Sequence, residues 1–175
     1  MRSVRLSLSI FVVGFLFTAT AFAQWTAPWE YFRNTPIPIN DFGTATSTIT
    51  VPDNFQIDEL QVMVNIDHSK ASDLRITLKD PNGSTYVLSE YNGGFDFGNG
   101  FPYEDYRFTI FDSRGQVPSM AIPGTAINDP ANNSPLFRGI YTPETTLPTG
   151  INGAGTWTLE VYDNLVGDTG NLLTW

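Results

Sequence analysis

The chain has no cysteine among its 175 residues and a single histidine, His68. Without cysteine no disulfide can form, so a folded domain must be stabilised by its hydrophobic core or by a bound metal. One histidine and no thiol also leave zinc short of its usual protein ligands. These absences exclude a disulfide scaffold and argue against a zinc enzyme.

Basic residues are scarce as well, because nine Lys and Arg stand against eighteen Asp and Glu. Arg2 and Arg5 lie in an N-terminal segment that we expect to be removed. The mature chain then keeps 7 basic and 18 acidic residues, a formal charge of −11. Such a surface repels nucleic acids and anionic membranes, and it suits solubility, basic partners or bound cations.

Long apolar runs are missing except for one at the N-terminus, Leu6–Phe17, which follows the two arginines and leads to Ala21-Phe22-Ala23. A basic start, an apolar run and a small-x-small end are typical of a secretory signal peptide. The run is shorter than the roughly 20 residues that a membrane-spanning helix needs. We predict a signal peptide over residues 1–23, cleaved between Ala23 and Gln24. The mature protein would be secreted, extracellular or held at the cell surface.

The rest of the chain reads as strands joined by turns. Glycine (15) and proline (12) are plentiful, and no segment after the signal keeps a helical period. Period-two alternation places apolar residues on one face of several segments. The expected strands are Ser47–Val51, Ile57–Asp67, Leu74–Leu78, Thr85–Ser89, Tyr106–Phe111, Gly139–Tyr141, Thr156–Tyr162 and Leu172–Trp175. This spacing predicts an all-β fold, an antiparallel sandwich or barrel.

Turns and ends define one domain. Asp80-Pro81-Asn82-Gly83 predicts a hairpin, since proline presets φ while Asn and Gly accept positive φ. Residues 24–36 form an irregular leader whose aromatic side chains either pack on the sandwich edge or offer a ligand platform. The domain spans residues 37–175. It ends in mid-strand at Trp175, which we expect to be exposed, so we predict that the chain is truncated at its C-terminus.

Four blocks of sequence together resemble one known family, the P domain or Homo B domain of subtilisin-like proprotein convertases and secreted bacterial proteins. The blocks, in order, are Asn65–His68 leading to Asp73–Leu78; Asp80–Gly83 with Val87-Leu88; Phe137–Glu144; and Gly155–Asn164 leading to Gly167–Gly170. The resemblance covers about residues 37–175.

The resemblance implies a β-sandwich of jelly-roll type that performs no catalysis. In convertases this domain packs on a preceding protease domain and stabilises it. The resemblance therefore implies that the partner of this chain is a subtilisin-like serine endopeptidase domain or another extracellular protein or polymer. Two departures matter: a signal and a short leader are all that precede the domain here, and the family's last strand usually continues past the tryptophan.

Catalytic residues are few. Ser119 lies in Pro118-Ser119-Met120-Ala121-Ile122-Pro123, which is similar to the serine motif of subtilisins. Val117-Pro118 stands where that motif has Gly-Thr, however, and no helical pattern follows. His68 is the one candidate base, and it lacks the residues that follow a subtilisin's catalytic histidine. A triad needs a nucleophile, a base and an orienting acid, so we expect no enzyme activity from this chain.

Calcium is the metal that the sequence favours, because it takes oxygen ligands from Asp side chains and loop carbonyls. The segment Asp163–Gly170 collects acids in a glycine-bearing loop. Asp73 and Asp112 lie at strand ends that we expect to reach the same rim. Calcium sites occur in some P domains, and the resemblance places matching acids at Asp73, Asp163 and Asp168. We predict a calcium site from these four residues, with turn-capping aspartates as the alternative.

Aromatic residues gather in the glycine-rich segment 91–106 and could stack on sugars or anchor a protein. The alternative is a loop folded over the core with its phenylalanines buried. The leading interpretation is a non-catalytic accessory module. The other interpretations are an adhesion or carbohydrate-binding module and, more remotely, an independent hydrolase.

Overall fold

A computed structural model describes residues 29–93, 104–114, 127–128 and 135–175. The expected signal peptide, its cleavage site at Ala23 and Gln24, Ser119, and residues 94–103 of the aromatic segment lie outside the described residues. The helices among the described residues include none long and apolar enough to cross a membrane.

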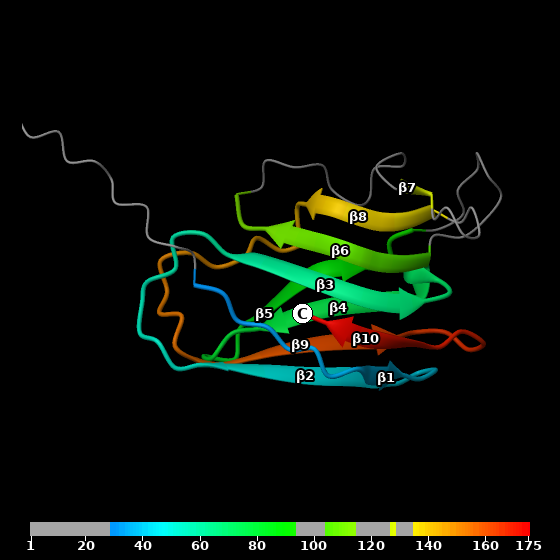
Figure 1. Cartoon of the computed structure of the whole chain (residues 1–175), viewed down its shortest axis with the longest axis horizontal. Helices are drawn as coiled ribbons and strands as arrows, with labels where there is room; N and C mark the ends of the chain where they lie inside the picture. Colours follow the sequence, from blue (N-terminus) through cyan, green and yellow to red (C-terminus); the bar gives the residue numbers. More distant parts are fainter. Residues whose placement is uncertain (1–28, 94–103, 115–126, 129–134) are drawn as a thin grey trace, which may run out of the picture.

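The strands form two sheets packed face to face (Figure 1). The six-stranded sheet has the order β1 (Ile37–Ile39), β10 (Gly170–Thr174), β3 (Gln61–His68), β6 (Glu104–Asp112), β8 (Pro135–Tyr141) and β7 (Ile127–Asn128). The four-stranded sheet has the order β2 (Thr44–Val51), β9 (Gly155–Asp163), β4 (Leu74–Lys79) and β5 (Thr85–Glu90). A single 3-10 turn, η1 (Ala71–Asp73), is the one helical element of the described chain.

The predicted β-sandwich is confirmed. Its neighbouring strands are antiparallel with one exception, β6 and β8, which run parallel. A parallel pair needs a long connection rather than a hairpin, and here more than twenty residues separate the two strands. The jelly-roll topology stays a prediction.

The alternation read from the sequence places the core correctly. Val62, Val64 and Ile66 of β3 are buried, as are the alternating apolar residues of β4 and β9. These last are Leu74, Ile76, Leu78, Trp157, Leu159 and Val161. Burying such side chains contributes roughly 1.5–3 kcal/mol each. A core of this kind stabilises the domain without the disulfides that the chain cannot form.

Several strand boundaries differ from those expected. β2 begins at Thr44 rather than Ser47, because it pairs with β9 over its whole length, from Thr44 opposite Tyr162 to Val51 opposite Gly155. β3 begins at Gln61 rather than Ile57. β1 was not expected, because Pro36 and Pro38 obscure it. Proline is tolerated there since β1 is an edge strand with one side unpaired.

The hairpin predicted at Asp80–Gly83 joins β4 to β5 as expected. Gly83 has φ +88° and its N–H donates to the carbonyl of Asp80 at 3.0 Å. The Asp80 carboxylate also accepts the N–H groups of Asn82 and Ser84, each at 2.9 Å. The turn is therefore held by its aspartate as well as by its glycine.

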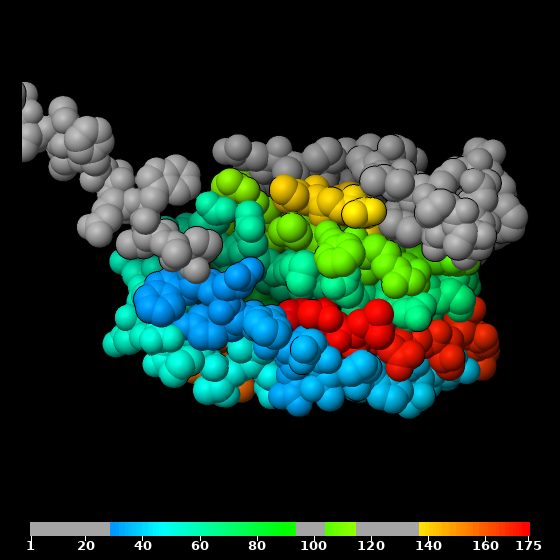
Figure 2. All heavy atoms as spheres, in the orientation of Figure 1, coloured from blue at the N-terminus to red at the C-terminus, as the bar shows by residue number. Residues whose placement is uncertain are grey.

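The leader and the last residue form part of the sandwich. Trp175 is buried, its Nε1 donates to Oγ of Ser47 at 2.8 Å, and its backbone exchanges two hydrogen bonds with Arg33. The expectation that Trp175 is exposed is therefore wrong. Figure 2 shows the leader, in blue, lying directly against the last strand, in red. The predicted truncation is not tested by this packing.

Candidate functional site

The ends of four strands and the short helix η1 bring most of the predicted site residues together. β3 ends at His68, η1 and β4 follow at Asp73 and Leu74, β9 ends at Asp163, and β10 begins at Gly170. The register places Leu74 opposite Asp163 and Gly170 opposite His68. We call this rim the acidic end of the sandwich; it lies at the right in Figure 1. Its aspartates are Asp41, Asp67, Asp73, Asp105, Asp163 and Asp168.

His68 and Asp163 form a buried pair at this end. Nε2 of His68 lies 3.2 Å from Oδ2 of Asp163, and both side chains are fully buried. A carboxylate accepts only, so Nε2 carries the hydrogen of this bond. The other carboxylate oxygen accepts the N–H of Leu165 at 3.0 Å. The pair has the composition of a catalytic base and its orienting acid, but a substrate cannot reach the imidazole in this structure.

Asp105 supports the pair from β6 and was missed as a site residue. Its Oδ1 accepts the backbone N–H of His68 at 2.7 Å, and its Oδ2 accepts two N–H groups of Arg107 at 3.0 and 2.7 Å. Its φ of +30° is unusual for a residue with a side chain. The position before a predicted strand gave no signal of this role, since the bonds depend on how β6 meets the end of β3.

Asp73 is the predicted ligand with an unused oxygen. Its Oδ1 lies 3.1 Å from Nζ of Lys70, while its Oδ2 is buried and has no hydrogen-bond partner among the described residues. Oδ1 of Asp41, on the turn between β1 and β2, is buried and unpartnered in the same way. Buried carboxylate oxygens without donors are costly. A bound cation would satisfy them.

The other predicted ligands are already engaged. Oδ1 of Asp168 accepts the hydroxyl of Ser69 at 2.6 Å, and both oxygens of Asp163 are bonded as described above. Among residues 29–93, 104–114, 127–128 and 135–175, no three His, Asp or Glu side chains are placed to hold a metal ion together. The residues present therefore fit calcium in part, chiefly through Asp73.

Asp112 does not join this group. β6 runs antiparallel to β3, so Asp112 lies opposite Gln61 at the start of β3, whereas His68 lies at its far end. The expectation that Asp112 reaches the same rim is wrong for this reason. Its carboxylate instead accepts hydrogen bonds from the side chains of Gln61 and Arg114 and from the Arg114 backbone. The hydrogen bonds from Arg114 lower the pKa of Asp112 from 3.8 to about 2.

This pKa gives a prediction for stability against pH. Because the pKa of Asp112 is lower in the folded than in the unfolded chain, this carboxyl stabilises the fold fully at pH values above its unfolded pKa of 3.8. The contribution is lost as the pH falls from 3.8 toward about 2. We expect Arg114→Ala to lower the free energy of unfolding at pH 6, because the Asp112 carboxylate loses the hydrogen bonds that lower its pKa. Urea denaturation at pH 6 and below pH 2 measures this difference. A difference that persists undiminished at the lower pH would assign the effect to packing instead.

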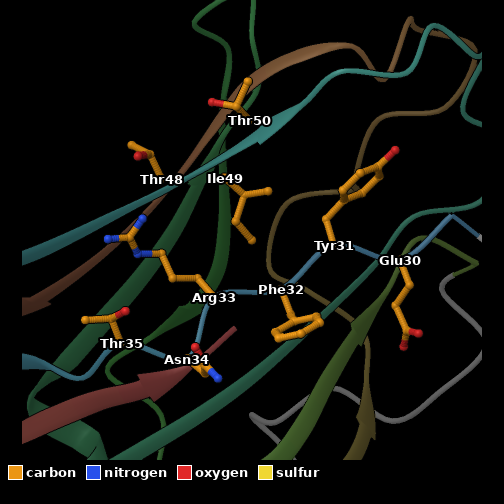
Figure 3. Close-up of a pocket in the computed structure, with 9 residues that line it drawn as sticks. All are labelled: Glu30, Tyr31, Phe32, Arg33, Asn34, Thr35, Thr48, Ile49 and Thr50. Atoms are coloured by element: carbon orange, nitrogen blue, oxygen red, sulfur yellow. The ribbon is translucent and has the colours of Figure 1, made fainter.

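A shallow groove of about 550 Å³ lies at the other end of β2, between the leader and the strand. Figure 3 shows its lining residues, which come from residues 30–35 and from Thr48, Ile49 and Thr50. Trp29 stacks on Phe55 with ring centroids 5.3 Å apart. The Tyr31 hydroxyl donates to Asp53 at 2.5 Å, and this hydrogen bond raises the pKa of Tyr31 to about 12. Trp29 and Tyr31 thus contact the sandwich edge, whereas Phe32 is 70% exposed and Trp25 lies outside the described residues, so both alternatives for the leader stay open. The adhesion or carbohydrate-binding interpretation stays a prediction.

Comparison with known proteins agrees with this architecture. Residues 57–116 match the family model of the proprotein convertase P-domain. No curated protein matches the chain. Two solved structures share its fold: the serine protease of Aeromonas sobria, and the same protease (ASP) in complex with the chaperone (ORF2).

Each of these structures is 20% identical to this chain, with a TM-score of 0.51 over 85% of its length. At that identity the likeness shows the fold alone. The chain spans 26% of the protease solved by itself and 25% of the protease solved with the chaperone, about a quarter of each. The segment matched by the family model carries β3 and β6 of the six-stranded sheet and β4 and β5 of the four-stranded sheet. The resemblance read from the sequence is thereby confirmed: residues 57–116 are similar to the proprotein convertase P-domain.

Proposed function

We propose that this chain is a non-catalytic accessory module that stabilises or positions a subtilisin-like serine endopeptidase. The P-domain match over residues 57–116 carries the proposal. The buried state of the one histidine supports it, since a general base must reach the proton that it removes. The fold of this chain matches about a quarter of a bacterial serine protease, which agrees with a module that works beside a catalytic domain.

The accessory function predicts that the chain stabilises a protease by binding its folded form. We expect it to raise the melting temperature of a subtilisin whose active site is blocked with phenylmethylsulfonyl fluoride. A ligand at 100 times its dissociation constant adds about 2.7 kcal/mol to the folded state. Differential scanning calorimetry measures the shift, with a charge-matched acidic protein as the control. An unchanged melting temperature at saturating concentration would contradict the proposal.

We further propose that the chain is secreted. The N-terminal segment with Arg2, Arg5 and the apolar run supports export. Expression of the full chain in a bacterial host with N-terminal sequencing of the exported protein tests this: the mature chain is expected to begin at Gln24.

Calcium binding at the acidic end is a separate proposal. Asp73 would bind the ion through its unpartnered Oδ2, and Asp163 and Asp168 would join it only by giving up hydrogen bonds that they make in this structure. Calcium would neutralise carboxylates that otherwise repel one another.

We expect EGTA to lower the melting temperature by about 5 °C or more in a preparation saturated with calcium, and added calcium to restore it. The variant Asp73→Asn should lose this response, whereas Asp112→Asn, at the opposite end, should keep it. A wild-type chain that does not respond to EGTA, and that shows no calcium in isothermal titration, would contradict calcium binding.

A further inference from the structure

An exposed apolar patch lies on two neighbouring loops at the acidic end. Phe42, on the turn between β1 and β2, is 61% exposed, while Leu165 and Val166, on the loop between β9 and β10, are 44% and 70% exposed. Figure 1 shows both loops at the same end of the sandwich, and Figure 2 shows both of them on the surface there. We call these three residues the apolar patch. Apolar side chains exposed on adjoining loops and surrounded by polar residues fit a protein interaction site.

Hydrogen bonds hold the two loops against each other. The N–H of Asp163 donates to the carbonyl of Gly43 at 3.0 Å, and the N–H of Gly167 donates to Oδ2 of Asp41 at 3.2 Å. These bonds bracket Phe42 on one loop and Leu165 with Val166 on the other. The N–H of Asn164 also donates to the carbonyl of Asp73 at 2.8 Å, which fixes the second loop to η1. The patch is therefore preorganised, so a partner would not bear the entropy of ordering these loops.

The backbone of Phe42 adds an independent observation. Its φ is +53°, in the left-handed region where glycine and asparagine are favoured and an aromatic side chain is disfavoured. A glycine at this position would relieve the backbone and remove an apolar ring from solvent. Phe42 therefore costs stability without packing into the core, a property that it shares with Phe108. What distinguishes Phe42 is its place on a loop that is hydrogen-bonded to the loop carrying Leu165 and Val166.

The charge around the patch indicates what kind of surface it meets. Asp41 and Asp168 are partly exposed on the same two loops, and Asp67 lies opposite Asn171 at the start of β10. The aspartates of the acidic end outnumber its basic side chains, Lys70 and Arg107, both of which already pair with aspartates. An apolar centre with an acidic rim fits a partner with an apolar centre and a basic rim.

We propose that the apolar patch is the surface by which this chain docks on a folded protein domain of basic rim, the protease domain of the proposed function. The inference rests on that function and names its contact surface. Phe42 and Val166 would supply the buried anchor of the interface, and the acidic rim would set orientation and salt dependence.

The test uses the full chain and, as the probe, a subtilisin of basic isoelectric point with its active site blocked by phenylmethylsulfonyl fluoride. Surface plasmon resonance measures the dissociation constants of the wild type, Phe42→Gly, Val166→Ser and Phe108→Gly. Phe108 is the matched control, because it is 58% exposed, has φ +49° and lies on β6 in the six-stranded sheet. Thermal denaturation of each variant is recorded beside the binding.

We expect Phe42→Gly and Val166→Ser to weaken binding at least about tenfold, which corresponds to 1.4 kcal/mol. Phe108→Gly should bind as the wild type does. Binding should also weaken as NaCl is raised, since the rim charges become screened. The melting temperature of Phe42→Gly should equal or exceed that of the wild type, a result that a merely structural role of Phe42 would not give.

Four results would overturn the inference. Wild-type binding that neither patch variant weakens would assign docking to another surface and leave the accessory function standing. Equal loss in Phe42→Gly and Phe108→Gly would show a general effect of exposed rings. A wild-type chain that self-associates by size-exclusion chromatography, with Phe42→Gly monomeric, would assign the patch to a second copy of the chain. A wild type that does not bind the blocked subtilisin at all would remove the proposed function together with the patch.

Discussion

Replacing His68 with alanine is expected to lower the free energy of unfolding by about 3–5 kcal/mol. The substitution leaves the Asp163 carboxylate buried at the junction of β4 and β9 without its imidazole partner. It also opens a cavity beneath the loop that carries Leu165. Urea denaturation followed by tryptophan fluorescence measures the loss, with an unchanged slope showing that the unfolding remains two-state.

Two further variants distinguish the loss of the hydrogen bond between His68 and Asp163 from the loss of the packed side-chain volume. His68→Gln keeps an N–H donor for Asp163 and should recover part of the loss. Ser69→Ala, next in the sequence, removes a hydroxyl bonded to Asp168 and should change stability by less than about 1 kcal/mol. If His68→Ala unfolds at the same urea concentration as the wild type, the pair does not stabilise this end of the sandwich.

The second large effect is expected at Gly170, where β10 begins beside β3. A Cβ added to Gly170 would lie 2.0 Å from the carbonyl oxygen of Asp67 and 2.7 Å from Cδ2 of His68. The closer of these atoms belongs to the backbone of a paired strand and cannot move aside cheaply. Gly170→Ala should therefore destabilise the fold by about 3 kcal/mol or more, at the upper end of the cost of overpacking. Urea denaturation measures the loss as it does for His68→Ala.

Gly167→Ala provides the control for this steric effect. A Cβ at Gly167 meets no atom within 4 Å, although the backbone has φ +110°. The variant should lose about 1–2 kcal/mol through the backbone alone. Equal losses at Gly167 and Gly170 would show that the close approach of β10 to β3 does not matter, which would contradict the geometry described for the acidic end.

Much of the fold could be predicted from the sequence because it depends on local alternation. The segments around Val64, Ile76 and Leu159 show period two, and each forms a strand with that face buried. The parallel pairing of β6 with β8 was not predictable in this way. Alternation says which face of a strand is buried, but it does not say which strand lies beside it or in which direction.

The site was predicted less well, for a related reason. Asp73, Asp163 and Asp168 reach one rim because β4 and β9 are paired and the loop to β10 returns beside β3. Asp112 was placed there wrongly, because the direction of β6 was unknown. Asp41 and Asp105 were missed, since their roles come from contacts between distant loops and strands. The apolar patch likewise depends on two loops whose association the sequence does not reveal.

The most direct test of the account is a casein assay made on this chain, a subtilisin and their mixture after incubation at elevated temperature. We expect no hydrolysis by the chain alone. The mixture should keep more activity than the subtilisin incubated with a charge-matched acidic protein, because binding stabilises the folded protease. Hydrolysis by the chain alone that Ser119→Ala abolishes, or a mixture that loses activity as fast as the control, would contradict the claim that this chain is a non-catalytic partner of a protease.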